Sequence, residues 1–560
     1  MRRSLATLIL TSLLVVSFSS ATWVPRVGAQ RKNPKAAPVS LALQRGVDTI
    51  TAAQLKDYLS FIASDVMEGR DTPSRGLDTT AQFLAMNLSR WGFKPAGDDG
   101  SFFQKIGLSR DVIDKAETRV QLNGQTLALG DDYIPFARPA ELPATQLVFA
   151  GNGWFVKSKN VDAYKGIDAK GKIAIIFAPP NGYPRGIATS DLTGKRGEDW
   201  MNAAEYAQKQ GVAGIVLIPD FQYLANWDRN RARITERGTT KVDKFQSSAG
   251  AQIPQIVVSP RIANSLFQGE RQNAGAIFES ASAAQLPDPF ALNPDKKLSL
   301  TVKVKSEALT TQNVVAVFEG SDAVLKNEYV ALGAHYDHVG VGIPVNGDAV
   351  YNGADDDGSG TTALLSMAEA LAKASVRPKR SVLFVWHAGE EKGLWGSRYF
   401  TDNPTIPLDK IVTQLNIDMI GRSKKEGDTN PLNRELSGPN EIYVIGSKMM
   451  STELGELTET VNQQYLNLTY DYRYDNPADP NRFFFRSDHY NYARKGIPIV
   501  FFFDGEHEDY HRPGDSVDKI DFQKMEKVAR TIYQTLWEVA NRPARPKVDK
   551  QLPAQLSSSQ

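Results

Sequence analysis

Histidine and carboxylate side chains recur at five places in the second half of the chain, each after an apolar run or before a helical pattern. They are His335, Asp355-Asp356-Asp357, Glu390-Glu391, Asp418 and His511. If the apolar runs are parallel strands, their carboxyl ends share one edge of a sheet, and these side chains converge there. So many converging carboxylates would repel one another unless a cation neutralised them. The pattern therefore predicts a metal site.

The types of donor indicate which metal the site would take. Two imidazoles combined with several carboxylates favour zinc or a similar transition metal over magnesium, which prefers an all-oxygen shell. Asp418 supports this, because a carboxylate that closes an apolar strand is costly to charge without a partner. Asp337 stands two residues after His335, so in an extended segment both side chains face the same side. Asp337 is therefore expected to lie behind the imidazole of His335 and to hold its orientation.

A second histidine motif competes with this interpretation. Residues 507–511 read His-Glu-Asp-Tyr-His, the H-E-x-x-H pattern of single-zinc metalloproteases. That pattern works on a helix, which brings both histidines to one face. Gly505 before it, Pro513 after it and the lack of an apolar face favour a loop, so the match is interpreted as accidental. The remaining histidines are expected to orient other groups or to pack (His338, His387, His489) or to be exposed at the rim (His507).

The apolar runs that precede these residues are typical of buried parallel strands. They span residues 313–318, 329–333, 381–386, 410–417, 441–445 and 497–503. Helical patterns alternate with them at 361–374 and 522–540, the second with one continuous apolar face. Alternating strands and helices predict an α/β fold with a mostly parallel sheet flanked by helices.

The chain also divides into regions of different pattern, and its 560 residues are enough for two or three domains. Residues 30–137 contain two helical patterns, at 55–62 and 78–91. Residues 138–290 hold four apolar runs around one helical stretch and read as a small separate α/β or β-rich unit. Residues 291–541 carry the chemistry described above. The Pro-, Lys- and Ser-rich tail, residues 542–560, is predicted to be disordered.

The overall composition excludes several classes of protein. Lys and Arg total 65 and Asp and Glu total 64, so a net charge of +1 leaves no basic surplus for binding nucleic acid. The sequence contains no cysteine, which excludes thiol nucleophiles, thiolate metal ligands and disulfides. Hydrophobic residues at 41% and charged residues at 23% are typical of a globular protein.

The first residues of the chain indicate export. Met1-Arg2-Arg3 is a short basic region, and an apolar run over residues 5–18 is followed by small residues. This is the pattern of a signal peptide, assigned to residues 1–29, with cleavage after Ala21 or Ala29. An uncleaved anchor is disfavoured, because the apolar run is short for a span of about 20 residues. We expect a periplasmic or secreted protein without stable membrane insertion after cleavage.

Taken together, five motifs in order resemble a known family, the co-catalytic di-zinc exopeptidases. The motifs are Ala-His-Tyr-Asp-His at 334–338, Asn-Gly-Ala-Asp-Asp-Asp-Gly-Ser-Gly at 352–360, Glu-Glu-Lys-Gly-Leu at 390–394, Asn-Ile-Asp-Met at 416–419 and Asp-Tyr-His-Arg-Pro at 509–513. The family includes bacterial leucyl aminopeptidases and glutamate carboxypeptidases. Residues 67–70 and 486–490 also look like family segments, and residues 138–290 resemble the protease-associated domain often inserted in this family.

The resemblance implies a zinc-exopeptidase fold that holds two Zn2+ ions. In that family pattern, His335 and Asp418 hold one zinc and Glu391 and His511 hold the other. Asp356, the middle aspartate of the triplet, bridges both ions.

The resemblance also assigns roles around the metals. Glu390 matches the general base, and Tyr510 matches a tyrosine that in some members hydrogen-bonds the oxyanion. Arg486 stands where some relatives have an arginine that contacts the substrate. The peptide bond between Asp356 and Asp357 is expected to be cis.

The expected function is that of an exported zinc metallo-aminopeptidase, which hydrolyses N-terminal residues from peptides. A hydroxide shared by the two metals would attack the scissile carbonyl while Glu390 moves the protons. A carboxypeptidase or dipeptidase of the same fold stays open as an alternative. The complete set of five ligands disfavours a glutaminyl-cyclase-like transferase and a catalytically inactive binding protein. The sequence leaves side-chain preference, oligomeric state and the role of residues 138–290 open.

Overall fold

The structure of the chain is a computed structural model that describes residues 46–180, 182–245 and 253–552. The predicted signal peptide at 1–29 and the residues that follow it up to 45 lie outside these ranges. Within them, no helix is long and apolar enough to cross a membrane.

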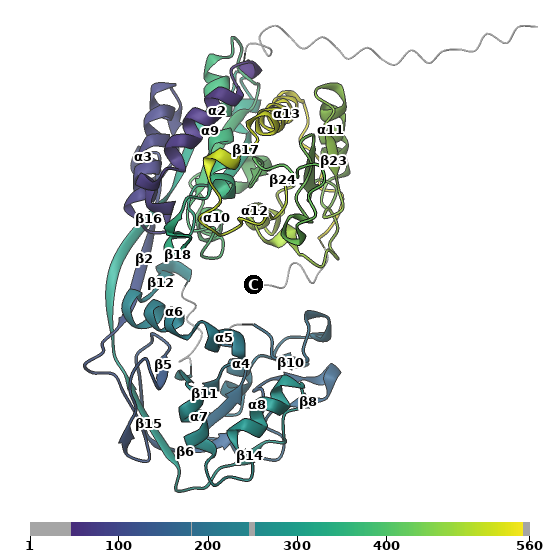
Figure 1. Cartoon of the computed structure of the whole chain (residues 1–560). Coiled ribbons are helices and arrows are strands. Elements are labelled where there is room, and N and C mark those ends of the chain that lie inside the picture. The colour runs from purple at the N-terminus through teal and green to yellow at the C-terminus, as the bar shows by residue number, and fades with distance from the viewer. Residues whose placement is uncertain (1–45, 181, 246–252, 553–560) are drawn as a thin grey trace, which may run out of the picture. The chain divides into compact units, whose positions relative to one another are not determined.

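A ten-stranded sheet within these ranges contains all six strands predicted in the second half of the chain (Figure 1). Its strands are β1 (Lys94–Pro95), β2 (Phe103–Ile113), β12 (Thr239–Val242), β16 (Val304–Phe318), β17 (Tyr329–His335), β20 (Ser381–His387), β21 (Ile411–Ile417), β22 (Glu441–Ile445), β23 (Thr469–Asp471) and β24 (Ile499–Phe503). They are ordered β12-β2-β16-β20-β17-β21-β24-β22-β23, with β1 beside β16. The α/β class is thus confirmed.

The sheet is mixed, with parallel pairs at its centre and at the β22-β23 edge, whereas the sequence predicts a mostly parallel sheet. β20, β17, β21 and β24 run parallel, but β16 runs antiparallel to β20, and β22 runs antiparallel to β24. Residues 319–328, which join β16 to β17, are too few for the crossover of a dozen or more residues that parallel strands need. An apolar run shows that a strand is buried, but it does not show the direction of that strand.

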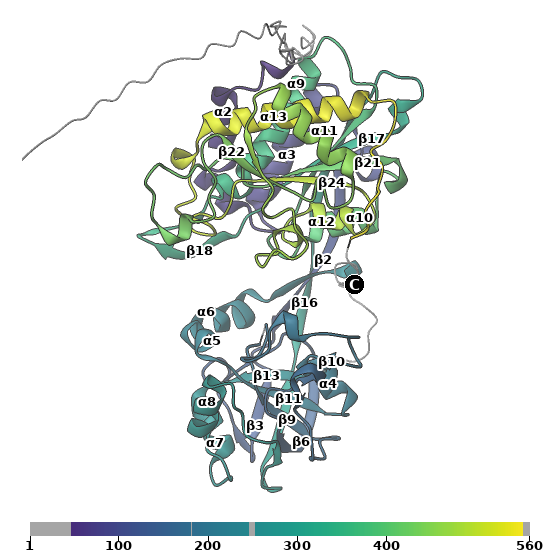
Figure 2. The ribbon, with the colours of Figure 1, turned by 90° about the vertical axis from the view of Figure 1, so that its right-hand side faces the viewer.

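Helices cover both faces of this sheet (Figures 1 and 2). One face carries α2 (Ala52–Ile62), α3 (Arg75–Arg90), α9 (Gly360–Lys373), α11 (Thr452–Gln464) and α13 (Phe522–Asn541), and the other carries α10 (Trp395–Asp402) and α12 (His489–Ala493). Every residue of β20 and β21 is buried between these layers. The polar ends of the central strands are therefore fixed by a core on both sides.

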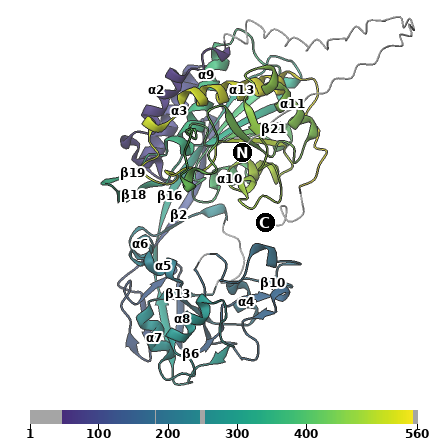
Figure 3. The same ribbon diagram turned by 45° about the vertical axis from the view of Figure 1, so that its right-hand side comes forward.

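A second, nine-stranded sheet forms the core of the inserted region (Figure 3). Its strands are β3 (Arg119–Leu122), β4 (Gln125–Thr126), β5 (Tyr133–Pro135), β6 (Ala140–Phe149), β9 (Ile173–Phe177), β11 (Gly214–Ile218), β13 (Gln255–Val258), β14 (Phe290–Ala291) and β15 (Lys297–Val302). The four predicted apolar runs are β6, β9, β11 and β13, and the predicted helix is α4 (Ala203–Lys209). Two further helices, α7 (Pro260–Phe267) and α8 (Ala274–Ser282), pack on each other, and α7 also contacts β13.

This second sheet is larger than the 138–290 region predicted from the sequence. β3, β4 and β5 precede that range and β15 follows it. These strands are short or carry polar residues, so a boundary drawn at long apolar runs misses them. Conversely, β12 lies inside the range but pairs with β2 of the first sheet. The likeness of this domain to a protease-associated domain stays a prediction.

Residues 542–552 belong to the tail predicted to be disordered, but in the structure they lie against the first domain. Arg545 Nε donates to Glu328 Oε1 at 2.8 Å, and the backbone N–H groups of Asp549 and Lys550 donate to the carbonyl of Met450. Leu552 packs against the core beside β22 and β24. Composition alone cannot anticipate such specific partners. Residues 553–560 lie outside the described ranges.

One buried arginine fastens the N-terminal helices to the loops that follow β17. Arg70 is completely buried, in the turn between α2 and α3. Its guanidinium donates to four carbonyl oxygens, those of Ile62, Tyr336, Asn352 and Gly353, at 2.7–2.9 Å. Since the carbonyls of Tyr336, Asn352 and Gly353 belong to segments that flank His335 and the Asp355–Asp357 triplet, Arg70 ties both segments to the end of α2.

Replacing Arg70 by methionine is expected to lower the free energy of unfolding by about 3–5 kcal/mol. The substitution keeps the apolar stem but leaves buried carbonyl oxygens without a donor, which is the costly half of a broken buried interaction. Urea unfolding measures the change. The matched control is Arg75→Met, because Arg75 is exposed and pairs with Glu68 at the surface, where a loss within about 0.5 kcal/mol is expected. Equal losses in the two variants would contradict the role given to Arg70.

Candidate active site

The predicted histidines and carboxylates come together at the carboxyl end of the central strands. His335 ends β17, and Asp418 follows β21 directly. Asp356 lies in η8 (Ala354–Ser359), the turn before α9. His335 Nε2 is 3.3 Å from Asp356 Oδ1 and 3.5 Å from Asp418 Oδ1. These three donor atoms form a first group.

A second group lies on the other side of the Asp356 carboxylate. His511 Nε2 is 3.1 Å from Asp356 Oδ2 and 3.0 Å from Glu391 Oε2. Asp356 therefore presents one oxygen to each group. Glu390 stands beside the first group, with Oε2 3.9 Å from His335 Nε2.

The donor atoms of both groups are suited to a cation. Six buried atoms here have no hydrogen-bond partner within the described ranges, and they are His335 Nε2, His338 Nδ1, His338 Nε2, Asp356 Oδ2, Glu391 Oε1 and His511 Nε2. Buried polar atoms are nearly always partnered, so a cluster of exceptions calls for a ligand. Imidazole nitrogens and carboxylate oxygens together are the ligands that zinc binds.

The tautomer of His335 supports the same conclusion. Its Nδ1 lies 3.1 Å from the backbone carbonyl oxygen of Asp337, which can only accept a hydrogen bond. Nδ1 therefore carries the proton, and Nε2 offers a lone pair to the first group. The sequence predicts that the Asp337 carboxylate orients this ring, but Oδ1 lies 3.8 Å away and instead accepts the backbone N–H of Glu390. The main-chain carbonyl of Asp337, rather than its carboxylate, therefore holds the ring.

The charges in the site shift one another's proton affinities. Burial would raise the pKa of Asp356, but His335, His338 and His511 lower it well below its ordinary value. Burial would lower the pKa of His511, but Asp356 and Glu391 raise it to about 10. A protonated His511 imidazole thus partly balances the carboxylates, and a divalent metal would displace its proton.

The three aspartates of the triplet have different partners. The Asp357 carboxylate lies within 4.8 Å of ligand atoms of His335 and Asp418, but it also accepts backbone N–H groups from His335, Gly360 and Met419 at 2.9–3.2 Å. Asp355 accepts the backbone N–H of Gly421 at 2.7 Å. Only Asp356 faces both donor groups, so we favour it over Asp357 as a shared ligand. The peptide bond between Asp356 and Asp357 is cis, as expected.

The H-E-x-x-H segment is a loop in the structure, as predicted, because no helix lies between β24 and Val517. His511 joins the second donor group, whereas His507 points elsewhere. The expectation that His507 is exposed at the rim is wrong, because it is buried with Nε2 3.4 Å from Asp355 Oδ2. A buried aspartate can partner a histidine in a polar loop, and no feature of the local sequence reveals this.

His338 lies closer to the donor groups than the sequence predicts. It is expected to pack or to orient other groups, yet its Nδ1 lies 2.8 Å from Glu391 Oε1 and 3.7 Å from Asp356 Oδ2. His387 and His489 do act as packing residues, with partners in Tyr492 and Phe484. One feature of the sequence does place His338 near the site, because it follows His335 by only three residues at the end of the same strand.

A small pocket opens beside the first donor group. Its walls are apolar at Met419, Phe483, Phe501 and Phe503, and its polar lining consists of Asp356, Glu390, Asp418, Arg486, Glu506 and Tyr510. Arg486 Nη2 lies 2.6 Å from Glu506 Oε1 and 3.5 Å from Tyr510 Oη. Burial and the nearby carboxylates Asp356 and Glu391 raise the pKa of Tyr510 well above its ordinary value, so its hydroxyl keeps its proton.

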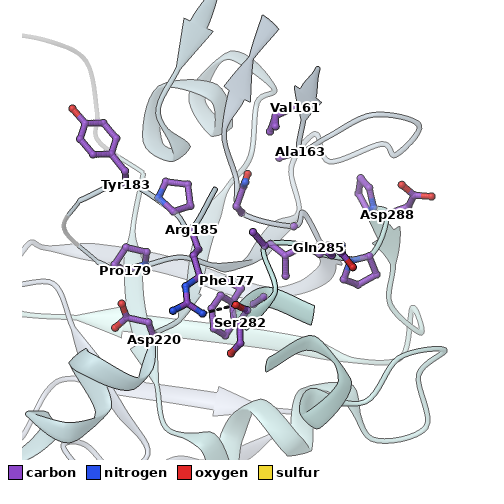
Figure 4. A pocket seen from close by; sticks show the side chains of 18 of the residues that line it. Val161, Ala163, Phe177, Pro179, Tyr183, Arg185, Asp220, Ser282, Gln285 and Asp288 are labelled. Carbon is purple, nitrogen blue, oxygen red and sulfur yellow. Dashed lines mark hydrogen bonds between the residues drawn. The ribbon is translucent and has the colours of Figure 1, made fainter. Parts of the chain in front are cut away.

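A larger pocket of about 510 Å3 lies in the inserted domain (Figure 4). Arg185 reaches across it to the carbonyl oxygen of Ser282. Two of its three carboxylates are engaged nearby, since Asp162 accepts from Tyr206 Oη at 2.6 Å and Asp220 from the backbone N–H of Tyr223 at 2.9 Å. No histidine is among the described residues that line it. Its chemistry therefore does not compete with that of the site at the sheet edge.

Comparisons with known proteins agree with this geometry. Residues 313–536 match the model described as peptidase family M28. The chain is 30% identical over 232 residues to leucine aminopeptidase 2 of Arthroderma otae, covering 40% of this chain and 43% of that protein. It is 30% identical over 249 residues to a probable zinc metalloprotease of Pyrenophora teres f. teres, covering 42% and 49%. The matched region spans less than half the length of these curated relatives.

A solved structure shows that the fold is known. An aminopeptidase from Aneurinibacillus sp. strain AM-1 superposes with a TM-score of 0.51, covering 91% of this chain and 98% of that one. The two sequences are 16% identical over this superposition, so it shows the fold alone.

Zinc is expected to raise the melting temperature of chelator-treated protein, because a cation cancels the repulsion among the carboxylates. At about a thousandfold excess over its Kd, a ligand stabilises the folded state by about 4 kcal/mol. Thermal denaturation with and without zinc measures the shift. Asp356→Asn should lose most of it, and Glu307→Gln, an exposed carboxylate on β16, should keep it. A melting temperature that zinc leaves unchanged would contradict a cation site here.

Proposed function

We propose that this chain, which carries a peptidase family M28 domain over residues 313–536, is a zinc-dependent aminopeptidase. One observation carries the proposal. The Asp356 carboxylate divides two groups of histidine and carboxylate donors, and a small pocket with one apolar wall, lined also by Glu390, adjoins the first group. The names of the relatives point to the same activity.

We assign the metal ligands from these two groups. His335, Asp418 and Asp356 would hold one zinc, and Glu391, His511 and Asp356 the other. Such a pair of ions supplies a polarised scissile carbonyl and a water whose pKa falls to about 7. Side chains of this protein carry out the remaining steps, which are proton transfer and stabilisation of the oxyanion.

Glu390 is the proposed general base. Burial raises the pKa of Glu390 well above its ordinary value, with Glu391 and Asp418 adding to the shift and His335 opposing it. The backbone N–H of Glu390 donates to Asp337 Oδ1 at 3.1 Å. This hydrogen bond fixes the backbone from which the Glu390 side chain reaches the pocket. It takes a proton from the attacking water and delivers it to the leaving amine.

Tyr510 and Arg486 would act on the substrate. Because Tyr510 keeps its proton, its hydroxyl can donate to the oxyanion that forms as the carbonyl is attacked. Arg486 lies 3.5 Å from that hydroxyl and can hold it in place. The apolar walls of the pocket suit an aliphatic or aromatic side chain on the residue that is released.

The charge of the pocket favours an aminopeptidase over a carboxypeptidase. Among the described residues that line it, Arg486 is the one cationic side chain, and Glu506 already neutralises it. A free substrate carboxylate would have to displace Glu506. A substrate ammonium group instead meets carboxylates, including Glu390 and Glu506.

Glu390→Gln is expected to retain both metals while kcat falls by about 10²–10⁴-fold, since the amide cannot accept the proton. Steady-state kinetics with a leucyl substrate and metal analysis of the purified variant measure the two effects. Glu391→Gln is the matched control, because it should lose zinc as well as activity. A Glu390→Gln enzyme within tenfold of the parent would exclude Glu390 as the base.

The activity itself is tested with one peptide series that has free, N-acetylated or C-amidated ends, with and without a zinc chelator. Mass spectrometry is expected to show chelator-sensitive release of single N-terminal residues that acetylation blocks. Cleavage of the acetylated but not the amidated peptide would identify a carboxypeptidase. No cleavage of any peptide after zinc is restored would leave a binding protein as the better description.

We also propose that the mature chain is exported. The support is the signal-peptide pattern of residues 1–29. The intact mass of the protein isolated from outside the cytoplasm should lack residues 1–21 or 1–29. A full-length mass would contradict cleavage.

A further inference from the structure

We propose that His338 is an additional ligand, so that four side chains hold the cation of the second group and only three hold that of the first. The inference rests on the proposed zinc site, but it concerns a residue outside the five ligands of the family pattern. The second cation would have His338, His511, Asp356 and Glu391, and the first would have His335, Asp356 and Asp418.

The fold holds the His338 ring in one place. Its side chain is completely buried, and its backbone N–H donates to the carbonyl of Arg70 at 3.1 Å. The ring lies against Gly353, where a Cβ atom would approach the His338 Cγ to 2.5 Å. Gly353 also has a φ of +54°, which favours glycine. A residue with a side chain at 353 would therefore push the ring out of its position.

The distances among the four donors suit one cation. His338 Nδ1 is 2.8 Å from Glu391 Oε1 and 3.7 Å from Asp356 Oδ2, and His511 Nε2 is 3.0 Å and 3.1 Å from the same two carboxylates. Around a tetrahedral zinc with bonds of about 2.0–2.1 Å, donor atoms are about 3.3 Å apart. The observed separations lie on both sides of that value.

A hydrogen bond from His338 to Glu391 is the competing explanation. At 2.8 Å the two atoms are close enough, but their alignment does not satisfy hydrogen-bond geometry. Neither ring nitrogen of His338 has a hydrogen-bond partner in the part of the chain that is described. A cation that binds both atoms from one side accounts for their close approach and also for the Nε2 of His511 beside them, which is unpartnered among the described residues.

The two metal positions would then differ in kind. Four protein donors, two of them imidazoles, make the second position a closed set of the sort that retains zinc structurally. Three donors leave the first position with an open site, as catalytic zinc ions have. His338 would thus make the second cation the tightly retained one and the first the exchangeable one.

The test uses cobalt and a unique cysteine. The chain has no cysteine, so His338→Cys introduces its only thiol. Because Nδ1 is the proposed donor, a cysteine sulfur at 338 reaches about the same point. Adding Co2+ to the metal-free variant is expected to produce a thiolate-to-cobalt charge-transfer absorption in the near ultraviolet. The matched control is Val339→Cys, the next residue, which belongs to neither donor group and should show no such band.

The outcomes separate this inference from the proposed function. A charge-transfer band in His338→Cys alone supports direct ligation. Two bound Co2+ ions in the wild type and in His338→Cys, without that band, would overturn the role of His338 and leave the aminopeptidase intact. A wild-type chain that binds no Co2+ would overturn both.

Two further measurements cover the case in which His338→Cys does not fold. X-ray absorption of the cobalt-loaded wild type should count three imidazoles per two ions if His338 is a ligand, and two if it is not. Competition with a chelator should show that His338→Gln weakens the tighter of the two sites by about 100-fold or more. Unchanged affinity of that site would contradict the proposal.

Discussion

The structure depends on one electrostatic constraint, the concentration of carboxylates at a buried sheet edge. Asp337, Asp356, Asp357 and Asp418 are all buried there, with Glu390 and Glu391 beside them. The protonated imidazole of His511 partly balances them, but the remaining repulsion and the unpartnered donor atoms among the described residues call for cations. The same surplus that would destabilise a protein without metal suits the two-ion site that we propose.

The fold supplies this concentration through parallel strands and fixes it through the backbone. β17, β20, β21 and β24 end at one edge, and each is followed by a segment that carries a charged residue. Charged groups outside the two donor groups hold the loops, as Asp357 does through three backbone N–H groups and Arg70 through four carbonyls. The residues proposed for chemistry therefore rest on buried ionic groups that take no part in it.

The sequence predicts the central strands and the meeting of His335, Asp355–Asp357, Glu390-Glu391, Asp418 and His511, because apolar runs mark buried strands and strand ends share an edge. The choice of Asp356 and Glu391 as ligands comes from the family resemblance instead. It does not predict strand direction at β16, which depends on the length of a connection. It also misses the burial of His507, whose partner Asp355 is distant in sequence. For His338 the one signal in the sequence is its position three residues after His335. The sequence also does not predict where the nine-stranded sheet begins and ends, because its short outer strands lack long apolar runs.

The most direct test of the central claim is anomalous diffraction from crystals grown with zinc, with data collected on both sides of the zinc absorption edge. The account predicts two anomalous peaks about 3.5–4 Å apart, one on each side of the Asp356 carboxylate. No peak at this edge of the sheet, or a single peak that Asp356 does not contact, would contradict it.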